Sequence, residues 1–97
     1  MSLQLKQDEI ETVKKILHQH LKNTDYRAFG SRAKHTARQY SDLDIVLISD
    51  QSIPLDVISH LKEDFAESNL PFMVDLVDWQ LITSEFREKI KGEWKIF

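Results

Sequence analysis

The sequence contains no cysteine, and only two glycines and two prolines occur among its 97 residues. The absence of thiols excludes disulfides and thiolate zinc sites and gives no sign of an oxidising compartment, so we expect a cytoplasmic protein. No segment approaches the roughly 20 apolar residues that a bilayer span needs. Residues 1–6 also lack the apolar core of a signal peptide. We therefore expect no association with a membrane.

Basic residues are outnumbered by acidic ones, 13 against 16, and the net charge is −3. The lysines and arginines are scattered rather than clustered, which argues against direct binding of nucleic acid. The apolar fraction of 41% and the charged fraction of 30% are typical of globular proteins. We expect one folded domain over residues 1–97, so that a separate substrate-recognition domain has to come from another chain.

Two segments of the first two thirds of the chain show the apolar spacing of amphipathic helices. The first runs from Asp8 to about Leu21, and Asp8 with Glu11 forms a variant of the capping box at its start. The second follows Pro54, ends near residues 68–69 and connects two parallel strands. The apolar face predicted for this second helix consists of Leu55, Ile58, Leu61 and Phe65.

The C-terminal part of the sequence predicts a third helix and an apolar tail. Thr83 or Ser84 caps the helix, and Gly92 ends it. The tail that follows carries Trp94, Ile96 and Phe97. These side chains either fold back on the core or form a patch that faces a partner, because an exposed aromatic cluster on a small domain needs covering.

Three segments read as strands: residues 26–29, 42–48 and 71–79. The second has a nearly continuous apolar end, which is typical of a central strand. The first stops at Gly30, and glycine lets the backbone approach a ligand closely. Ser31 can cap a short helical turn over residues 32–34, whose free N–H groups favour phosphate. An ordinary Gly-Ser turn is the alternative.

Two aspartates stand two residues apart at the start of the second strand. Side chains alternate along a strand, so Asp42 and Asp44 share a face, about 7 Å apart at their bases. Their mutual repulsion is explained either by a divalent cation between them or by solvation at a strand end. Asp75 interrupts the third apolar strand, where a carboxylate is costly unless it is solvated, paired or metal-bound. Asp78, at the end of that strand, reads as a turn residue, which leaves Asp75 as the better third ligand.

The four histidines show no pair spaced by four residues on one helix face, and no serine or cysteine nucleophile arrangement is recognisable. His18, His20 and His60 therefore read as surface residues. His35 lies between the Gly-Ser pair and the aspartates, where it either contacts substrate or is solvated.

Taken together, Gly30-Ser31, the nine-residue spacer, Ser41-Asp42-Leu43-Asp44 and the later Asp75 resemble the minimal nucleotidyltransferases of the DNA polymerase β superfamily. The resemblance covers residues 26–78 and implies an α+β (α/β-like) fold, a small mixed sheet flanked by helices. It implies that Gly30 and Ser31 bind the phosphates of ATP. It also implies that Asp42, Asp44 and Asp75 are catalytic residues that hold Mg²⁺, with two ions expected.

The sequence departs from the pattern of this family at one place. An Arg-Gly pair often follows Gly-Ser-x-Ala in the family, whereas this chain has Lys34-His35. Lysine keeps the charge of arginine but loses its bidentate fork. Histidine in place of glycine disfavours a positive φ or a close backbone approach at that position, although histidine tolerates a positive φ better than bulky branched residues do.

As a single domain of this size, the chain resembles the antitoxin half of a two-gene system whose partner is an all-helical HEPN toxin. The resemblance implies transfer of AMP from ATP to a tyrosine of that partner. One alternative is a non-catalytic antitoxin or scaffold that binds a HEPN-type helical partner by contact. A weaker alternative is nucleotide addition to nucleic acid, which the acidic net charge disfavours.

Overall fold

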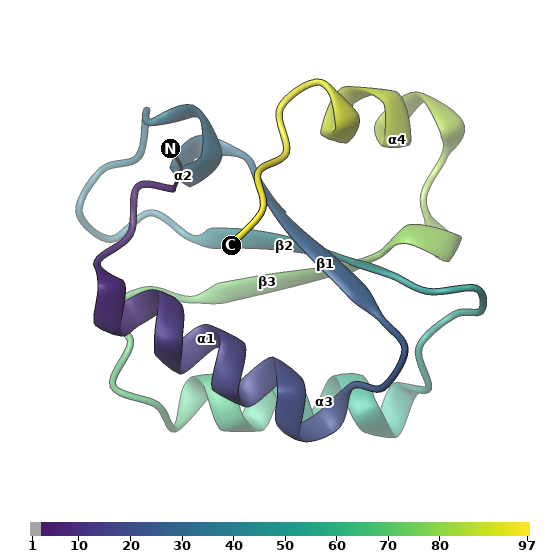
Figure 1. Ribbon diagram of the computed structural model, residues 1–97, viewed down its shortest axis with the longest axis horizontal. Helices are drawn as coiled ribbons and strands as arrows, with labels where there is room; N and C mark the ends of the chain where they lie inside the picture. Colours follow the sequence, from purple (N-terminus) through teal and green to yellow (C-terminus); the bar gives the residue numbers. More distant parts are fainter. Residues whose placement is uncertain (1–2) are drawn as a thin grey trace.

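A three-stranded mixed sheet forms the centre of the computed structural model, which describes residues 3–97 (Figure 1). The strand order is β1-β2-β3, with β1 antiparallel to β2 and β2 parallel to β3. The strands are β1 (Asp25–Phe29), β2 (Leu43–Ile48) and β3 (Val74–Asp78). The helices are α1 (Gln7–His20), α2 (Ser31–Lys34), α3 (Leu55–Ala66) and α4 (Ser84–Lys91). The expected α+β fold with a central second strand is confirmed.

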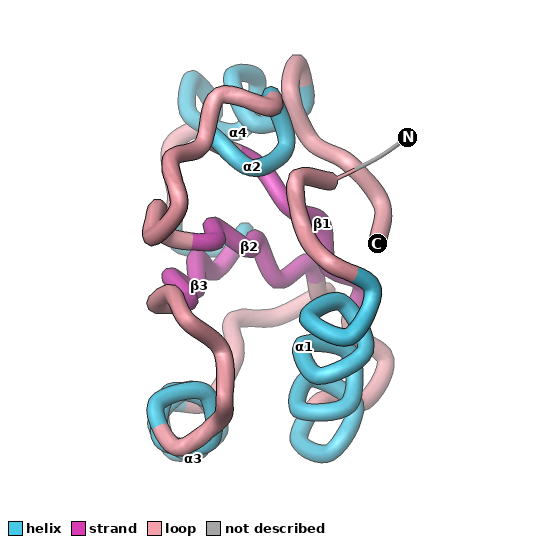
Figure 2. Tube along the Cα trace, turned by 90° about the vertical axis from the view of Figure 1, so that its left-hand side faces the viewer, coloured by secondary structure: helices cyan, strands magenta, loops and turns pink. Residues whose placement is uncertain are grey.

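The sheet lies between two helical layers, with α1 and α3 side by side on one face and α4 on the other (Figure 2). Side-chain alternation along β2 divides its residues between the two faces. The odd-numbered residues Leu43, Ile45 and Leu47 are fully buried in the larger core beneath α1 and α3. Val46 points to the opposite face and packs with Phe29 and Ile90 of α4. Each face of the sheet therefore has its own core.

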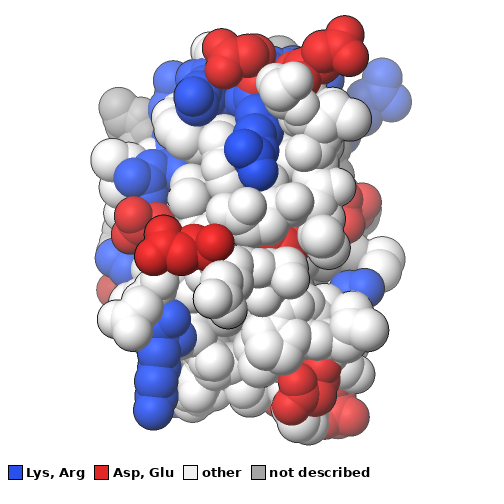
Figure 3. Space-filling model, turned by 90° about the vertical axis from the view of Figure 1, so that its right-hand side faces the viewer, with Lys and Arg blue, Asp and Glu red and all other residues white. Residues whose placement is uncertain are grey.

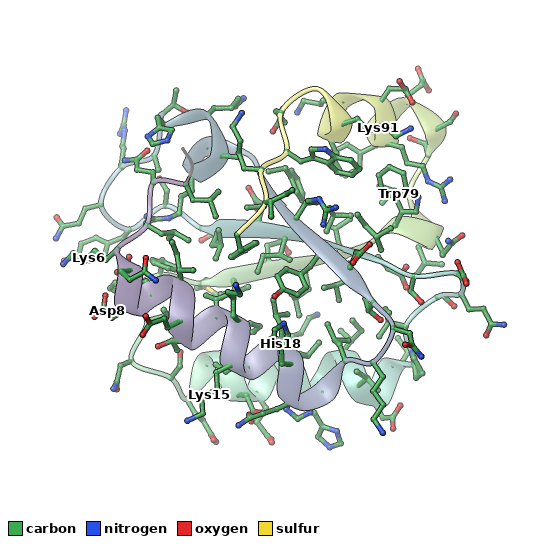
Figure 4. All side chains as sticks on the ribbon, in the orientation of Figure 1. Lys6, Asp8, Lys15, His18, Trp79 and Lys91 are labelled. Atoms are coloured by element: carbon green, nitrogen blue, oxygen red, sulfur yellow. The ribbon has the colours of Figure 1, made fainter. Side chains whose placement is uncertain are left out.

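Helix α1 begins one residue before the predicted start, and its cap differs from the expected one. Lys6 occupies the N-cap, and its N–H donates to the Glu9 side chain at 2.9 Å. The prediction that Asp8 caps the helix with Glu11 is wrong, because Asp8 already lies within the first turn. An acidic residue there still stabilises the positive end of the helix dipole. Figure 4 shows Lys6 and Asp8 at this end of α1.

Helix α3 follows Pro54 and connects the parallel strands β2 and β3, as expected. Leu61 and Phe65 are buried in the larger core, and Ile58 packs against it. The predicted apolar face is wrong at Leu55, which is 83% exposed. Leu55 is the first residue of the helix, so periodicity alone did not show that the first turn extends beyond the core.

Predicted turn and cap residues are confirmed in the segment that leads to α4. Asp78 accepts hydrogen bonds from Ile53 N–H at 2.7 Å and Gln80 N–H at 2.9 Å, and it caps the 3-10 helix η1 (Trp79–Leu81). Thr83 then caps α4 by accepting from Phe86 N–H at 3.1 Å. Gly92 occupies the C-cap.

The apolar tail folds back on the sheet, as the first of the two alternatives for it expects. Lys95 and Ala28 exchange two backbone hydrogen bonds, of 2.8 and 3.0 Å, along the outer edge of β1 (Figure 1). Phe97 packs edge-on against Tyr26, with 5.3 Å between ring centroids. Trp94 packs against Trp79, whose ring also lies below Lys91 of α4 (Figure 4). Ile96 stays 70% exposed.

Charges of both signs are interspersed on the face that carries the ends of β2 and β3, and neither sign forms a continuous field there (Figure 3). Within residues 3–97, no helix combines the length and the apolar character needed to cross a membrane.

Candidate active site

The structure brings two of the predicted aspartates together at the end of the sheet where β1 stops and β2 and β3 start. Asp44 and Asp75 are direct partners in the parallel register of β2 and β3. On its other side, Asp44 pairs with Phe29, the last residue of β1. Asp42 lies just before β2 and shares the strand parity of Asp44. Asp44 and Asp75 therefore belong to the face of the sheet that carries α4, and Asp42 lies just outside the strand beside them.

Gly30 lies against the Asp44 carboxylate in a conformation that glycine alone adopts readily. Its φ is 76° and its ψ is −157°. A Cβ atom at this position would overlap Asp44 Oδ2 and lie 3.2 Å from Asp44 Cγ. The missing side chain is thus the space that the Asp44 carboxylate occupies.

The pKa of Asp44 is raised from 3.8 to about 6. Partial burial is the largest cause, because desolvation penalises the charged carboxylate. The neighbouring carboxylates of Asp75, Asp42 and Glu93 raise the pKa further, and Lys89 on α4 opposes them. A half-buried carboxylate surrounded by others of its kind attracts a divalent cation.

The short helix α2 follows Gly30, and its start differs from the prediction. Gly30 itself occupies the N-cap, and its carbonyl accepts from the N–H groups of Ala33 and Lys34, both at 3.1 Å. Ser31 is the first helical residue, so its predicted role as the cap is wrong. His35 ends α2 in the left-handed region, with φ 59° and ψ 36°. Histidine thus keeps the positive φ for which the family pattern has glycine.

Arg32 is a buried anchor that sequence reasoning missed. Its guanidinium donates to the carbonyl oxygens of Gln4, Gln39 and Ser41 at 2.9, 3.1 and 3.0 Å. It also lies over the Phe72 ring, 4.2 Å from the centroid. These contacts fix the polar loop that leads into the aspartates.

Glu93 contributes a further carboxylate that sequence reasoning also missed. Its Oε2 accepts from Gly30 N–H at 2.6 Å, and its Oε1 lies 4.0 Å from Lys34 Nζ. The Gly30 N–H is therefore already hydrogen-bonded within the chain. No periodicity or short motif marks Glu93, because its partner is 63 residues away in the chain.

Comparison with protein-family models shows the family to which the chain belongs. The model described as "Polymerase beta, Nucleotidyltransferase" matches residues 11–97, which is most of the chain. The chain belongs to this nucleotidyltransferase family. It is also 46% identical over 91 residues to a Haemophilus influenzae protein named "Probable protein adenylyltransferase MntA", covering 92% of this chain and 78% of that protein.

Solved structures of similar fold include two toxin–antitoxin complexes. A mutant of the toxin–antitoxin pair named MntA-HpeT matches with a TM-score of 0.72 and 26% identity, over 95% of this chain and 71% of that one. A toxin–antitoxin crystallised with AMP-PNP matches with a TM-score of 0.74 and 23% identity, over 88% of this chain and 68% of that one. The polymerase β-type fold expected from the sequence is confirmed.

The acids of this nucleotidyltransferase share one end of the sheet without closing into a cage. Among residues 3–97, no three histidine, aspartate or glutamate side chains form a group that could by itself hold a metal ion. Magnesium does not need such a cage, because it keeps several waters and is bound by one or two carboxylates plus phosphate oxygens. The hard oxygen donors around Asp44 fit this ion.

A groove opens beside the acids, on the side away from Gly30. It has a volume of about 880 Å³ and runs between the end of α3 and the start of β3. Asp42 and Asp75 line it, together with the exposed side chains of Tyr40 and Met73. This groove therefore lies next to Asp75.

Proposed function

We propose that this protein is a Mg²⁺-dependent adenylyltransferase that transfers AMP from ATP to a tyrosine of a HEPN-type helical toxin, acting as its antitoxin. One observation carries the proposal: Asp44 and Asp75 are register partners at the sheet end where Gly30 leaves room for the Asp44 carboxylate. The 46% identity to a protein named as an adenylyltransferase supports the reaction type. The toxin–antitoxin complexes of similar fold support the kind of partner.

In this proposal Asp42, Asp44 and Asp75 hold the Mg²⁺, and the turn at Gly30 and Ser31 binds the phosphates. Bound Mg²⁺ neutralises charge that develops on the triphosphate. The groove beside Asp75 would admit the acceptor hydroxyl to the α-phosphate of ATP bound at these residues. Asp75 is exposed on the edge strand, so it can accept the proton of an incoming hydroxyl.

The proposed reaction is a substitution at the α-phosphorus of ATP. The tyrosine oxygen forms a bond to the α-phosphorus, the bond from that phosphorus to the bridging oxygen breaks, and pyrophosphate leaves. The hydroxyl proton passes to the Asp75 carboxylate. The negative charge added to the partner by AMP is suited to silencing a toxin that acts on an anionic substrate.

The test is transfer of label to the helical partner. The purified protein, its partner and Mg²⁺ are incubated with ATP labelled at the α-phosphate, and a parallel reaction uses label at the γ-phosphate. We expect the α-label alone on the partner, and its loss in the Asp42→Asn, Asp44→Asn double variant. Asp50→Asn, Asp56→Asn is the matched control, because both aspartates are exposed and lie outside the site.

Two results contradict the proposal in different ways. Label from the γ-phosphate means phosphoryl rather than nucleotidyl transfer. If the double variant transfers nothing yet still neutralises the toxin in cells, the protein acts by contact alone.

A further inference from the structure

The turn after α4 lies opposite the Gly30 turn, and the backbone register explains why. Ala28 and Lys95 pair in antiparallel fashion. Two residues onward from Ala28 is Gly30, and two residues back from Lys95 is Glu93, so antiparallel pairing sets these two opposite each other. Figure 1 shows the tail descending beside β1 after α4.

Glu93 is fixed at both ends of its short segment. On one side, the N–H groups of Glu93 and Trp94 both donate to Ile90 O, at 3.0 and 2.8 Å, which closes α4. On the other side, the Lys95 pairing holds the tail to β1. The Glu93 side chain is only 13% exposed. Its carboxylate therefore has little freedom to leave Gly30.

The hydrogen bond from Gly30 N–H to Glu93 Oε2 is short, at 2.6 Å, and involves a charged acceptor. Hydrogen bonds to charged groups contribute more than neutral ones. This bond orients the peptide that enters Gly30, and the conformation of Gly30 in turn provides the space for the Asp44 carboxylate. Glu93, Gly30 and Asp44 thus form a chain of contacts from the tail to the acids.

We propose that Glu93 is a positioning residue of the transfer site, acting through Gly30 to hold Asp44 in place; this inference rests on the function proposed above. The C-terminal tail is then part of the active site as well as a cover for the sheet. Glu93 touches neither the acceptor nor the reacting phosphorus in this role. Its contribution is the geometry of the turn.

The experiment compares Glu93→Ala and Glu93→Gln in the transfer assay with the helical partner. Alanine removes the acceptor of the Gly30 N–H, whereas glutamine keeps an acceptor oxygen of the same reach. We expect Glu93→Ala to lower kcat about 10- to 100-fold, because misplacement of a reacting group by about 1 Å costs this much. KM for ATP should change less than about threefold, and Glu93→Gln should recover most of kcat. Glu88→Ala on α4 is the matched control, since Glu88 is 75% exposed and forms an ion pair with Lys91, away from Gly30.

A purely structural role predicts a different pattern. In that case Glu93→Ala lowers the melting temperature while the folded protein keeps its kcat and KM, and the proposal is overturned. A lower KM for ATP with an unchanged or higher kcat also overturns it, because the carboxylate then obstructs the turn.

Amide exchange measured by NMR separates failure of this inference from failure of the proposed function. The chain has only two glycines, so the Gly30 amide is readily assigned. We expect this amide to be protected in the wild type and in Glu93→Gln, and to lose protection in Glu93→Ala. If the wild type transfers no AMP but the three proteins show this pattern of protection, the proposed function is refuted and the contact between Glu93 and Gly30 is supported. An unprotected Gly30 amide in the wild type overturns the positioning role directly.

Discussion

Substituting alanine for Gly30 tests the geometry of the site most directly. The φ of 76° and ψ of −157° belong to a region essentially reserved for glycine, and a residue with a side chain there costs about 1–3 kcal/mol. The new Cβ also overlaps Asp44 Oδ2, and forcing Asp44 off its rotamer costs about 1 kcal/mol more. We expect Gly30→Ala to lower the free energy of unfolding by about 2–4 kcal/mol and transfer activity about 100-fold.

Urea unfolding measures the first quantity, and the labelled-ATP assay measures the second. Gly92→Ala is the matched control, because a Cβ there lies 3.5 Å from Lys89 O, an ordinary contact, and φ is −69°. Adding Asp44→Ala to Gly30→Ala should remove the overlap and leave the backbone cost, so the two substitutions should couple by about 1 kcal/mol. A Gly30→Ala protein that is as stable and as active as Gly92→Ala would refute the reasoning.

Two further substitutions test the electrostatics and the loop. The raised pKa of Asp44 means that the folded protein binds a proton more tightly than the unfolded chain, so stability falls as pH rises from about 4 to about 6 and stays lower above that. Thermal melts without Mg²⁺ should therefore show that Asp44→Asn is more stable than the wild type by on the order of 1 kcal/mol at pH 8, a value that allows for solvent screening of a half-exposed group. At pH 4 the substitution should bring no gain in stability. A gain that is independent of pH would contradict this. Arg32→Lys should lower the free energy of unfolding, measured in urea, by about 2–4 kcal/mol, because the lysine ammonium cannot donate to three separate carbonyl oxygens as the guanidinium does. The control Arg38→Lys, at an exposed position, should be nearly neutral. Equal effects of the two substitutions would contradict the anchoring role of Arg32.

The pairing of Asp44 with Asp75 could be predicted from the sequence, because the residue patterns that indicate strands are local. Apolar runs located β2 and β3, and a helical pattern between them required a parallel connection. Both aspartates lie near the start of their strands, and parallel strands begin at the same edge of a sheet. An approximate register was therefore sufficient to bring the carboxylates together.

The roles of Arg32 and Glu93 could not be predicted from the sequence, because their hydrogen-bond partners are distant in the chain. Arg32 looks like one of several surface cations, and only the folded chain shows that Gln4 passes within 2.9 Å of its guanidinium. Glu93 follows a helix end, where a charged residue is unremarkable. The error at Leu55 has a similar origin, since periodicity gives the direction of a side chain but not the extent of the core.

The position of the acids follows from how the two cores share the strands. Alternation that buries Leu43, Ile45 and Leu47 under α1 and α3 forces Asp44 to the other face. There α4 covers Val46 through Ile90 but leaves Asp75 exposed and Asp44 half-buried. A shift of β2 by one residue would exchange the residues that face the larger core with those that face α4. It would bury the Asp44 carboxylate in the larger core, which is strongly unfavourable for an unpaired charge. The apolar pattern of β2 therefore protects the register on which the aspartate pair depends.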